Sequence, residues 1–91
     1  MLFRSQIVNC TARDVDFSET DLTQAVCTGT DFAESRFMKT NLSEADFTGA
    51  TNYTISANLN TLKKTKFSLP EAVSLLYSLD IILVDADNNA D

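Results

Sequence analysis

Apolar residues recur at every fifth position over most of the chain. Counted from Leu2, these central positions hold Leu2, Ile7, Ala12, Phe17, Leu22, Cys27, Phe32, Phe37, Leu42 and Phe47, and later Leu62 and Phe67. Two places before each lies a small or medium residue, in the series Ser5, Cys10, Val15, Thr20, Ala25, Thr30, Ser35, Thr40, Ala45 and Ala50. The other three positions of each five carry most of the charged side chains.

A period of five fits neither a regular helix nor a straight strand. Five residues advance a helix by about 140°, so the large residues would spiral around it without forming a stripe. On a strand, an odd period would send alternate central residues to opposite faces. The pattern is satisfied if the chain turns once per repeat, so that the central and small series both point to the axis of a coil.

The residues leave open whether three or four repeats complete a coil. Spacings of fifteen and twenty both stack apolar central residues. At fifteen, Asp16, Asp31 and Asp46 would lie over one another, and like charges directly opposite destabilise neighbouring strands. At twenty, Asp16 lies over Arg36, and one like-charged pair remains elsewhere. The surface charges therefore favour four.

Four segments carry a family resemblance: Thr20-Asp21-Leu22-Thr23-Gln24, Thr30-Asp31-Phe32-Ala33-Glu34, Thr40-Asn41-Leu42-Ser43-Glu44 and Ala45-Asp46-Phe47-Thr48-Gly49. With their register they make residues 2–51 resemble the pentapeptide-repeat family. The resemblance implies an all-β solenoid, a right-handed quadrilateral β-helix with four repeats per coil. For this chain that means about three coils over residues 1–67.

The pattern lapses at 52–60, which we interpret as an irregular excursion within the last coil, and resumes at Leu62. A short capping helix is predicted next, with Ser68 and Glu71 as a capping box and Pro70 in the first turn. Its apolar face, expected to cover the end of the core, comprises Leu69, Ala72, Val73, Leu76 and Leu79. The run 67–72 is similar to the C-terminal ends of many bacterial family members.

The capping helix and an extended segment are expected over 68–84, with the segment at 81–84 apolar and β-branched. Residues 85–91 are expected to form an acidic, mobile tail. At the other end, Met1, Leu2 and Phe3 start inside the repeat register, which exposes a coil edge. Either two chains associate through this end, or the chain is the C-terminal piece of a longer solenoid.

Several apolar residues occupy positions that the repeat does not require to be buried, namely Phe3, Val8, Val26, Met38 and Tyr53. Exposed apolar surface at the ends of a solenoid favours association. Our candidate interface therefore comprises Phe3, Val8, Leu76, Leu79, Ile81 and Ile82.

The sequence holds no histidine, no Cys-x-x-Cys pair and no glycine-rich phosphate loop. Cys10 and Cys27 fall on inward positions and are expected to be buried free thiols. The carboxylates recur at outward positions and are interpreted as solvated surface. We therefore predict a protein that is not an enzyme, with no catalytic residues, no metal and no cofactor.

The formal net charge of −6 disfavours direct binding of nucleic acid or of an anionic membrane. No apolar run approaches the roughly 18 residues of a membrane span, and no signal peptide is apparent. A cytoplasmic location is expected, with a second copy or another protein as the partner.

Two functions are weighed. The first is a structural or interaction module that associates through its ends, as a homodimer. The alternative is a DNA mimic that acts on DNA gyrase or topoisomerase IV, as the resemblance to quinolone-resistance members implies. Residues 2–67 would form a rod about 16 Å long, which matches roughly five base pairs and is short for that task. The first function is therefore preferred.

Overall fold

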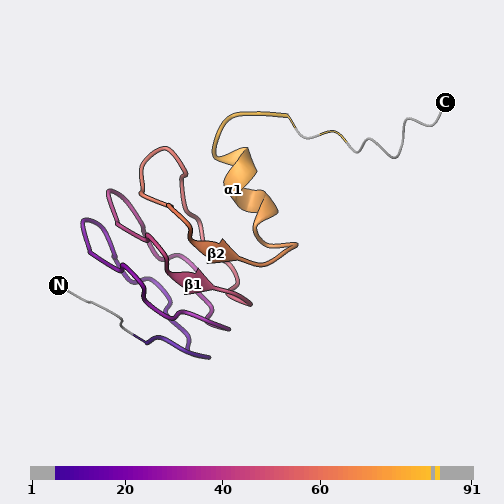
Figure 1. The fold of residues 1–91 in the computed structure, drawn as a ribbon. Coiled ribbons are helices and arrows are strands. Elements are labelled where there is room, and N and C mark those ends of the chain that lie inside the picture. Colours follow the sequence, from indigo (N-terminus) through magenta and orange to yellow (C-terminus); the bar gives the residue numbers. More distant parts are fainter. Residues whose placement is uncertain (1–5, 83, 85–91) are drawn as a thin grey trace.

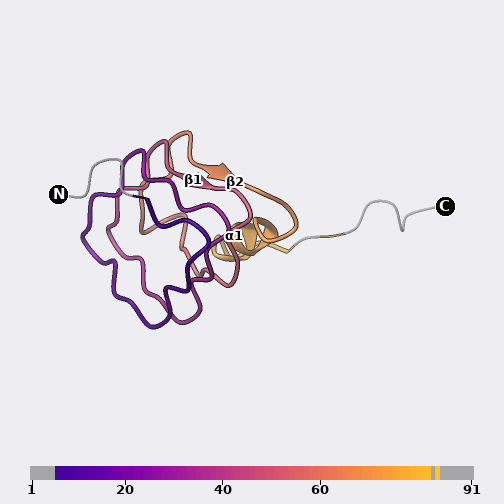
Figure 2. The ribbon, with the colours of Figure 1, turned by 90° about the horizontal axis from the view of Figure 1, so that it is seen from below.

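The computed structural model describes residues 6–82 and 84, and the structural statements below concern these residues. Three short regular elements are present among them: strand β1 (Asp46–Phe47), strand β2 (Lys66–Phe67) and helix α1 (Val73–Tyr77). Most of the chain is wound into stacked coils, and α1 follows the last of them (Figure 1). Seen from below, the outlines of successive coils lie over one another (Figure 2).

Parallel backbone pairing joins each coil to the next. Asp46 and Phe47 of β1 pair with Lys66 and Phe67 of β2. Isolated parallel bridges continue the same pairing at Gln6↔Val26, Thr11↔Asp31, Asp16↔Arg36, Asp21↔Asn41, Val26↔Asp46, Asp31↔Thr51 and Asn41↔Thr61. Every bridge spans twenty residues, which is four five-residue repeats, and none printed for the described residues spans fifteen.

From the first described coil to Gly49, and again at Lys64, each repeat turns the chain at a residue with positive φ two places after its central residue. Asp14, Glu19 and Lys39, for example, have φ values of 57°, 58° and 57°. An L-residue in this region carries a steric penalty of about 1 kcal/mol, so the corners are held by the pairing between coils and not by local preference.

Side chains at small core positions link the coils a second time. The hydroxyl of Thr40 donates to the carbonyl of Phe17 at 2.7 Å, and the hydroxyl of Thr65 donates to that of Leu42 at 2.7 Å. The same bond, always 23 residues back along the chain, is made by Thr30 to Ile7, by Ser35 to Ala12 and by the Asn60 amide to Phe37. A buried backbone carbonyl without a hydrogen-bond donor is costly in free energy. Polar side chains are therefore tolerated inside the coil, because each of them donates to such a carbonyl.

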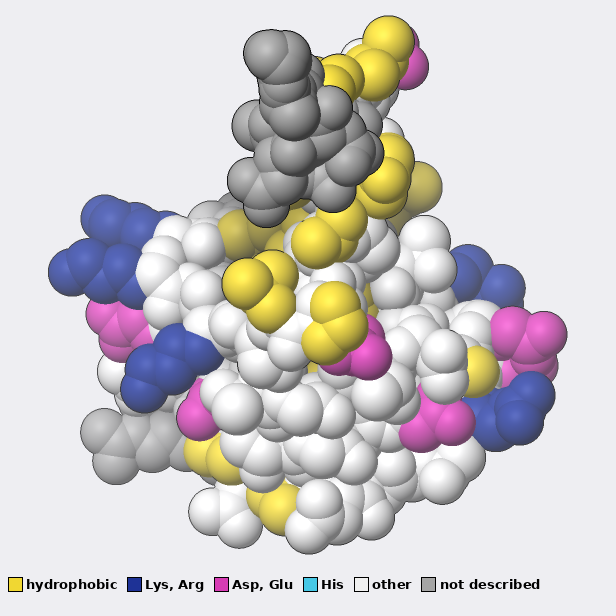
Figure 3. Space-filling view, turned by 90° about the vertical axis from the view of Figure 1, so that its right-hand side faces the viewer, with side chains coloured by type: hydrophobic (Ala, Val, Ile, Leu, Met, Phe, Trp, Pro, Cys, Tyr) yellow, Lys and Arg dark blue, Asp and Glu magenta, His cyan; other side chains and the backbone are white. Residues whose placement is uncertain are grey.

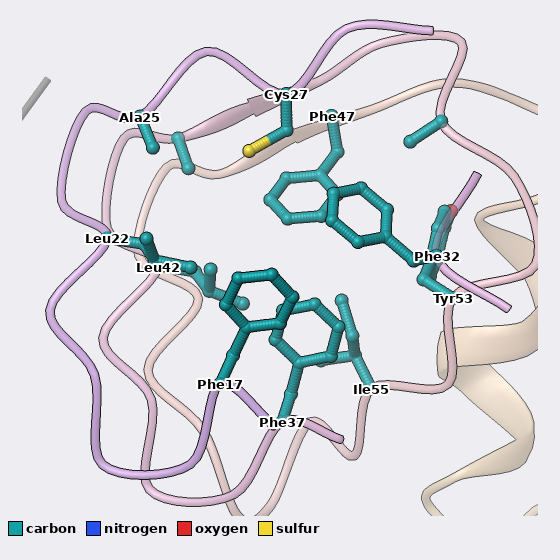
Figure 4. Packing of buried hydrophobic residues seen from close by; sticks show 12 residues of the cluster. Phe17, Leu22, Ala25, Cys27, Phe32, Phe37, Leu42, Phe47, Tyr53 and Ile55 are labelled. Carbon is teal, nitrogen blue, oxygen red and sulfur yellow. The ribbon is translucent and has the colours of Figure 1, made fainter. Parts of the chain in front are cut away.

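Aromatic rings fill the axis of the coil. Phe17 stacks on Phe37 with ring centroids 5.0 Å apart, and the ring of Phe32 contacts those of Phe37 and Phe47 at 5.7 and 5.2 Å. The buried cluster consists of Phe17, Leu22, Ala25, Cys27, Phe32, Phe37, Leu42, Ala45, Phe47, Ala50, Tyr53 and Ile55 (Figure 4). Thr30, Ser35 and Thr40 are buried beside it. Ile7, Ala12, Leu62 and Phe67 are half-buried and pack against it.

The first coil departs from the expected burial. Cys10 is exposed and Val15 is 38% exposed, although both occupy small core positions, and Thr20 is half-buried. The reason is that, among the described residues, the first coil is paired only with the coil that follows it, so the other side of these side chains is left open. The expected core residues Leu2 and Ser5 lie outside the described residues.

The last coil keeps the register but changes which residues face inward. Pairing resumes at Thr61, twenty residues after Asn41, so 52–60 contains neither an insertion nor a deletion. Within this stretch Asn52 is exposed, whereas Tyr53 is only 5% exposed and Ile55 is buried. The expectation that Tyr53 faces outward was wrong, because this segment is released from bridge pairing and its side chains no longer follow the repeat.

The C-terminal segment also differs from the predicted helix. Helix α1 begins at Val73, and no side chain caps its N-terminus, so Ser68 and Glu71 do not form a capping box. The Ser68 hydroxyl instead accepts a hydrogen bond from the Gly49 amide at 2.8 Å. Leu75 packs on the core, while Leu69 is 77% exposed.

Replacing Thr40 by Val tests the hydroxyl links. The change keeps the shape of the side chain but leaves the Phe17 carbonyl without its donor, so we expect the free energy of unfolding to fall by about 1–3 kcal/mol. Urea unfolding followed by circular dichroism measures the loss. Thr48→Val is the matched control, because that hydroxyl bonds to Asp46 at the exposed surface, where water can replace it. Equal losses in the two variants would contradict this account.

Candidate functional site

The described residues include no group of three or more His, Cys, Asp or Glu side chains that could hold a metal ion. Nor does any helix among them have the length and apolar character needed to cross a membrane.

The two cysteines lie in opposite environments. Cys27 is fully buried, and this burial, with a smaller contribution from the charge of Asp46, raises the pKa of its thiol to about 12. Cys10 is exposed, and its thiol donates to the Val8 carbonyl at 3.2 Å. Cys27 thus acts as a packed apolar side chain.

The acidic residues just before the central positions serve the turns. A carboxylate oxygen of Asp21 accepts from the amide and the hydroxyl of Thr23, at 3.0 and 2.6 Å. Asp46 accepts from Thr48 in the same way. These hydrogen bonds hold the pKa of both carboxyls below the ordinary value. Asn41 makes the same contacts with Ser43 without a charge, so the position requires an acceptor and not an acid.

The charged surface is mixed in sign. The backbone register places Arg36 one coil away from Asp16 and Lys66 one coil away from Asp46, and each positive charge contributes to lowering the pKa of the neighbouring carboxyl. Arg13 and Glu34 approach to 3.9 Å and form an ion pair at the surface. Among the described residues, these contacts interrupt the negative surface along the coil walls.

The most apolar exposed surface lies after the last coil. Figure 3 shows hydrophobic side chains running along the segment that leaves the coiled body. We call these residues the C-terminal apolar patch, which consists of Leu69, Leu76, Tyr77, Leu79, Ile81, Ile82 and Val84.

The candidate interface residues are distributed between the two ends. Val8 is exposed in the first coil, and Phe3 lies outside the described residues. Leu76, Leu79, Ile81 and Ile82 are all exposed and belong to the C-terminal apolar patch; Ile82 is 88% exposed. Of the other outward apolar residues, Met38 is exposed and Val26 is half-buried.

A cleft of about 370 Å³ lies between the altered last coil and the segment that contains α1. It is lined by Asn52, Tyr53, Pro70, Glu71, Ser74 and Tyr77. Sequence reasoning missed this cleft. The available signal was the polar Asn52 at a central position, which marks the point where the inward series is broken.

The segment containing α1 is tied to the last coils by two backbone-to-hydroxyl bonds. The Gly49 amide donates to Ser68, and the Ala57 amide donates to Ser78 at 3.1 Å. Because Leu75 also packs on the core, α1 has a defined position, and so does the cleft beside it.

Comparison with known proteins gives one family match. The sequence pattern of pentapeptide repeats matches residues 9–51 in eight copies. No curated protein matches the chain significantly.

The difference between the thiols can be measured directly. We expect the native protein to react rapidly with one equivalent of Ellman's reagent, at Cys10, and with a second only after denaturation, because Cys27 is buried and its pKa is raised. Cys10→Ser should abolish the rapid reaction. Rapid reaction of Cys27 in that variant would show that the coil opens readily.

Proposed function

We propose, since this chain belongs to the pentapeptide-repeat family, that it is a non-enzymatic interaction module that associates with a second copy of itself through its C-terminal end. The observation that carries this proposal is the C-terminal apolar patch. Seven of the large apolar side chains exposed among the described residues lie within 69–84. A soluble protein rarely exposes so much apolar surface in one segment unless another molecule covers it.

A second copy suits the patch because a matching surface of large apolar side chains would cover the ones exposed here. Leu76 and Leu79 lie three residues apart and so project to one side of α1 and the turn after it. A two-fold arrangement would bring these residues against their own equivalents, giving a closed dimer. If the first coil of one copy bound the last coil of another, each copy would still have one free end, and further copies could add to form an open chain.

Within the proposed module, the described residues up to Phe67 form one right-handed, four-sided coil of about three turns, and α1 acts as its cap. The packing of Leu75 on the core and the bonds to Ser68 and Ser78 support the capping role. A cap of this kind protects the apolar axis and at the same time presents its outer side to a partner.

The alternative, a DNA mimic that acts on a topoisomerase, requires a long and continuous negative surface. The pairing of Asp16 with Arg36 and of Asp46 with Lys66 works against that requirement. We therefore favour the interaction module, and the two functions can be separated by experiment.

Self-association is tested by light scattering behind a sizing column. We expect a mass of twice the 10.0 kDa of one chain. Leu76→Asp should yield monomer with an unchanged circular dichroism spectrum, because Leu76 is exposed and contributes little to the core. Met38→Asp is the matched control, since Met38 is also exposed but lies on the wall of the coil. A monomeric natural sequence, or equal effects of the two variants, would overturn the proposal.

A supercoiling assay tests the alternative. We expect the purified protein to leave the supercoiling activity of DNA gyrase unchanged at micromolar concentration, because its negative surface is short and interrupted. Inhibition that is abolished by reversing the charge of outward carboxylates would instead support the DNA mimic.

A further inference from the structure

The cleft beside α1 contains a polar group that the fold itself does not satisfy. The Tyr53 hydroxyl is buried and has no hydrogen-bond partner within the described part of the chain. Tyr53 lies at the side of the core that faces α1 (Figure 4), with its ring 5.4 Å from that of Phe67. A buried hydroxyl without a partner costs free energy, and such groups are rare in folded proteins.

The charge in the cleft is also unmatched. Glu71 is half-buried, and within residues 6–82 and 84 no ion pair or hydrogen bond to its carboxylate is found. The side-chain amide of Asn52, which also lines the cleft, donates to Asp31 at 3.0 Å, so a second carboxylate lies close to the cleft. No basic side chain lines the cleft. The negative charge of the protein at this cleft therefore favours a positively charged ligand.

The remaining lining suits a flat cation. Tyr77 is exposed and offers an aromatic ring to the cleft, and Ser74 adds a hydroxyl. A guanidinium group has donors in a planar fork, which matches a carboxylate, and it stacks on aromatic rings. An anion would be repelled by Glu71, and a neutral group would leave that charge unpaired.

We propose that this cleft binds the guanidinium group of an arginine side chain presented by a partner protein. Glu71 accepts hydrogen bonds from the guanidinium fork and thereby gains the partner that it lacks within the described chain, and Tyr77 covers one face of the guanidinium. The Tyr53 oxygen is buried, so it accepts a further N–H by a shift of its side chain towards the cleft as the guanidinium enters.

This site adjoins the surface proposed for self-association, and Tyr77 belongs to both. Glu71 and Ser74 lie in the cleft and not in the C-terminal apolar patch, whereas Leu76 and Leu79 lie in the patch and do not line the cleft. The inference therefore goes beyond self-association, and the two can fail independently. A dimer that binds no arginine removes only the cleft proposal, and a monomer that binds arginine removes only the dimer.

The test uses the tyrosines as probes. The chain has two tyrosines and no tryptophan, so Tyr77→Phe leaves Tyr53 as its only tyrosine while keeping an aromatic ring in the cleft. N-acetyl-arginine amide is titrated into this variant, and tyrosine fluorescence and the NMR signals of the Tyr53 ring are followed. We expect a saturable change in at least one readout, and binding about tenfold weaker after addition of Glu71→Gln.

Matched controls separate the site from general charge attraction. Glu19→Gln removes an exposed carboxylate on the coil wall and should leave the affinity unchanged. N-acetyl-citrulline amide, which has the shape of arginine without its charge, should not bind, and N-acetyl-lysine amide should bind more weakly. The proposal is overturned if neither readout changes, if the two Glu variants weaken binding equally, or if citrulline or lysine binds as tightly as arginine.

Discussion

Backbone pairing between residues twenty apart is the interaction on which the rest of this structure depends. The amide of Leu22 bonds to the carbonyl of Asn41 at 2.8 Å, and that of Cys27 bonds to Asp46 at 2.8 Å, and equivalent bonds recur from coil to coil. A five-residue segment cannot hold its corner alone, because the residue at the corner has a positive φ that L-residues disfavour. Each coil is therefore stable because its neighbours fix the conformation of its corners.

That constraint explains the distribution of polar groups inside the coil. Some backbone carbonyls accept no hydrogen bond from the backbone pairing between coils. They accept one instead from a hydroxyl of the next coil, as the Phe17 carbonyl does from Thr40. Where the small residue is Ala45, its amide bonds to the Leu42 carbonyl within the same turn. Thr65 then supplies a second donor to that carbonyl. Burial of apolar rings and satisfaction of backbone groups are thus achieved by the same repeat.

A solenoid of this kind has uniform walls and distinctive ends, so functional surface is concentrated where the repeat stops. In this chain the last coil keeps its register but turns Tyr53 inward in place of Asn52, while Ile55 fills the small core position that follows Ala50. The altered coil and the segment tied to it through Ser68 and Ser78 enclose a cleft and expose an apolar patch. Both features arise where the pairing of the repeat is interrupted, at 52–60, and where it ends, after Phe67.

The sequence by itself determined which side chains of the middle coils point to the axis, because each five-residue repeat meets an equivalent repeat above and below. It also placed a helix after Pro70, since an apolar run with helical spacing is a local property. The ends were decided by tertiary structure alone. Cys10 and Val15 follow the inward pattern but are exposed, because burial depends on a stacked coil that the pattern does not supply. Ser68 occupies a position that is typical of a helix N-cap in the sequence. Its hydroxyl accepts a hydrogen bond from the Gly49 amide instead, and only the folded coil brings that amide near.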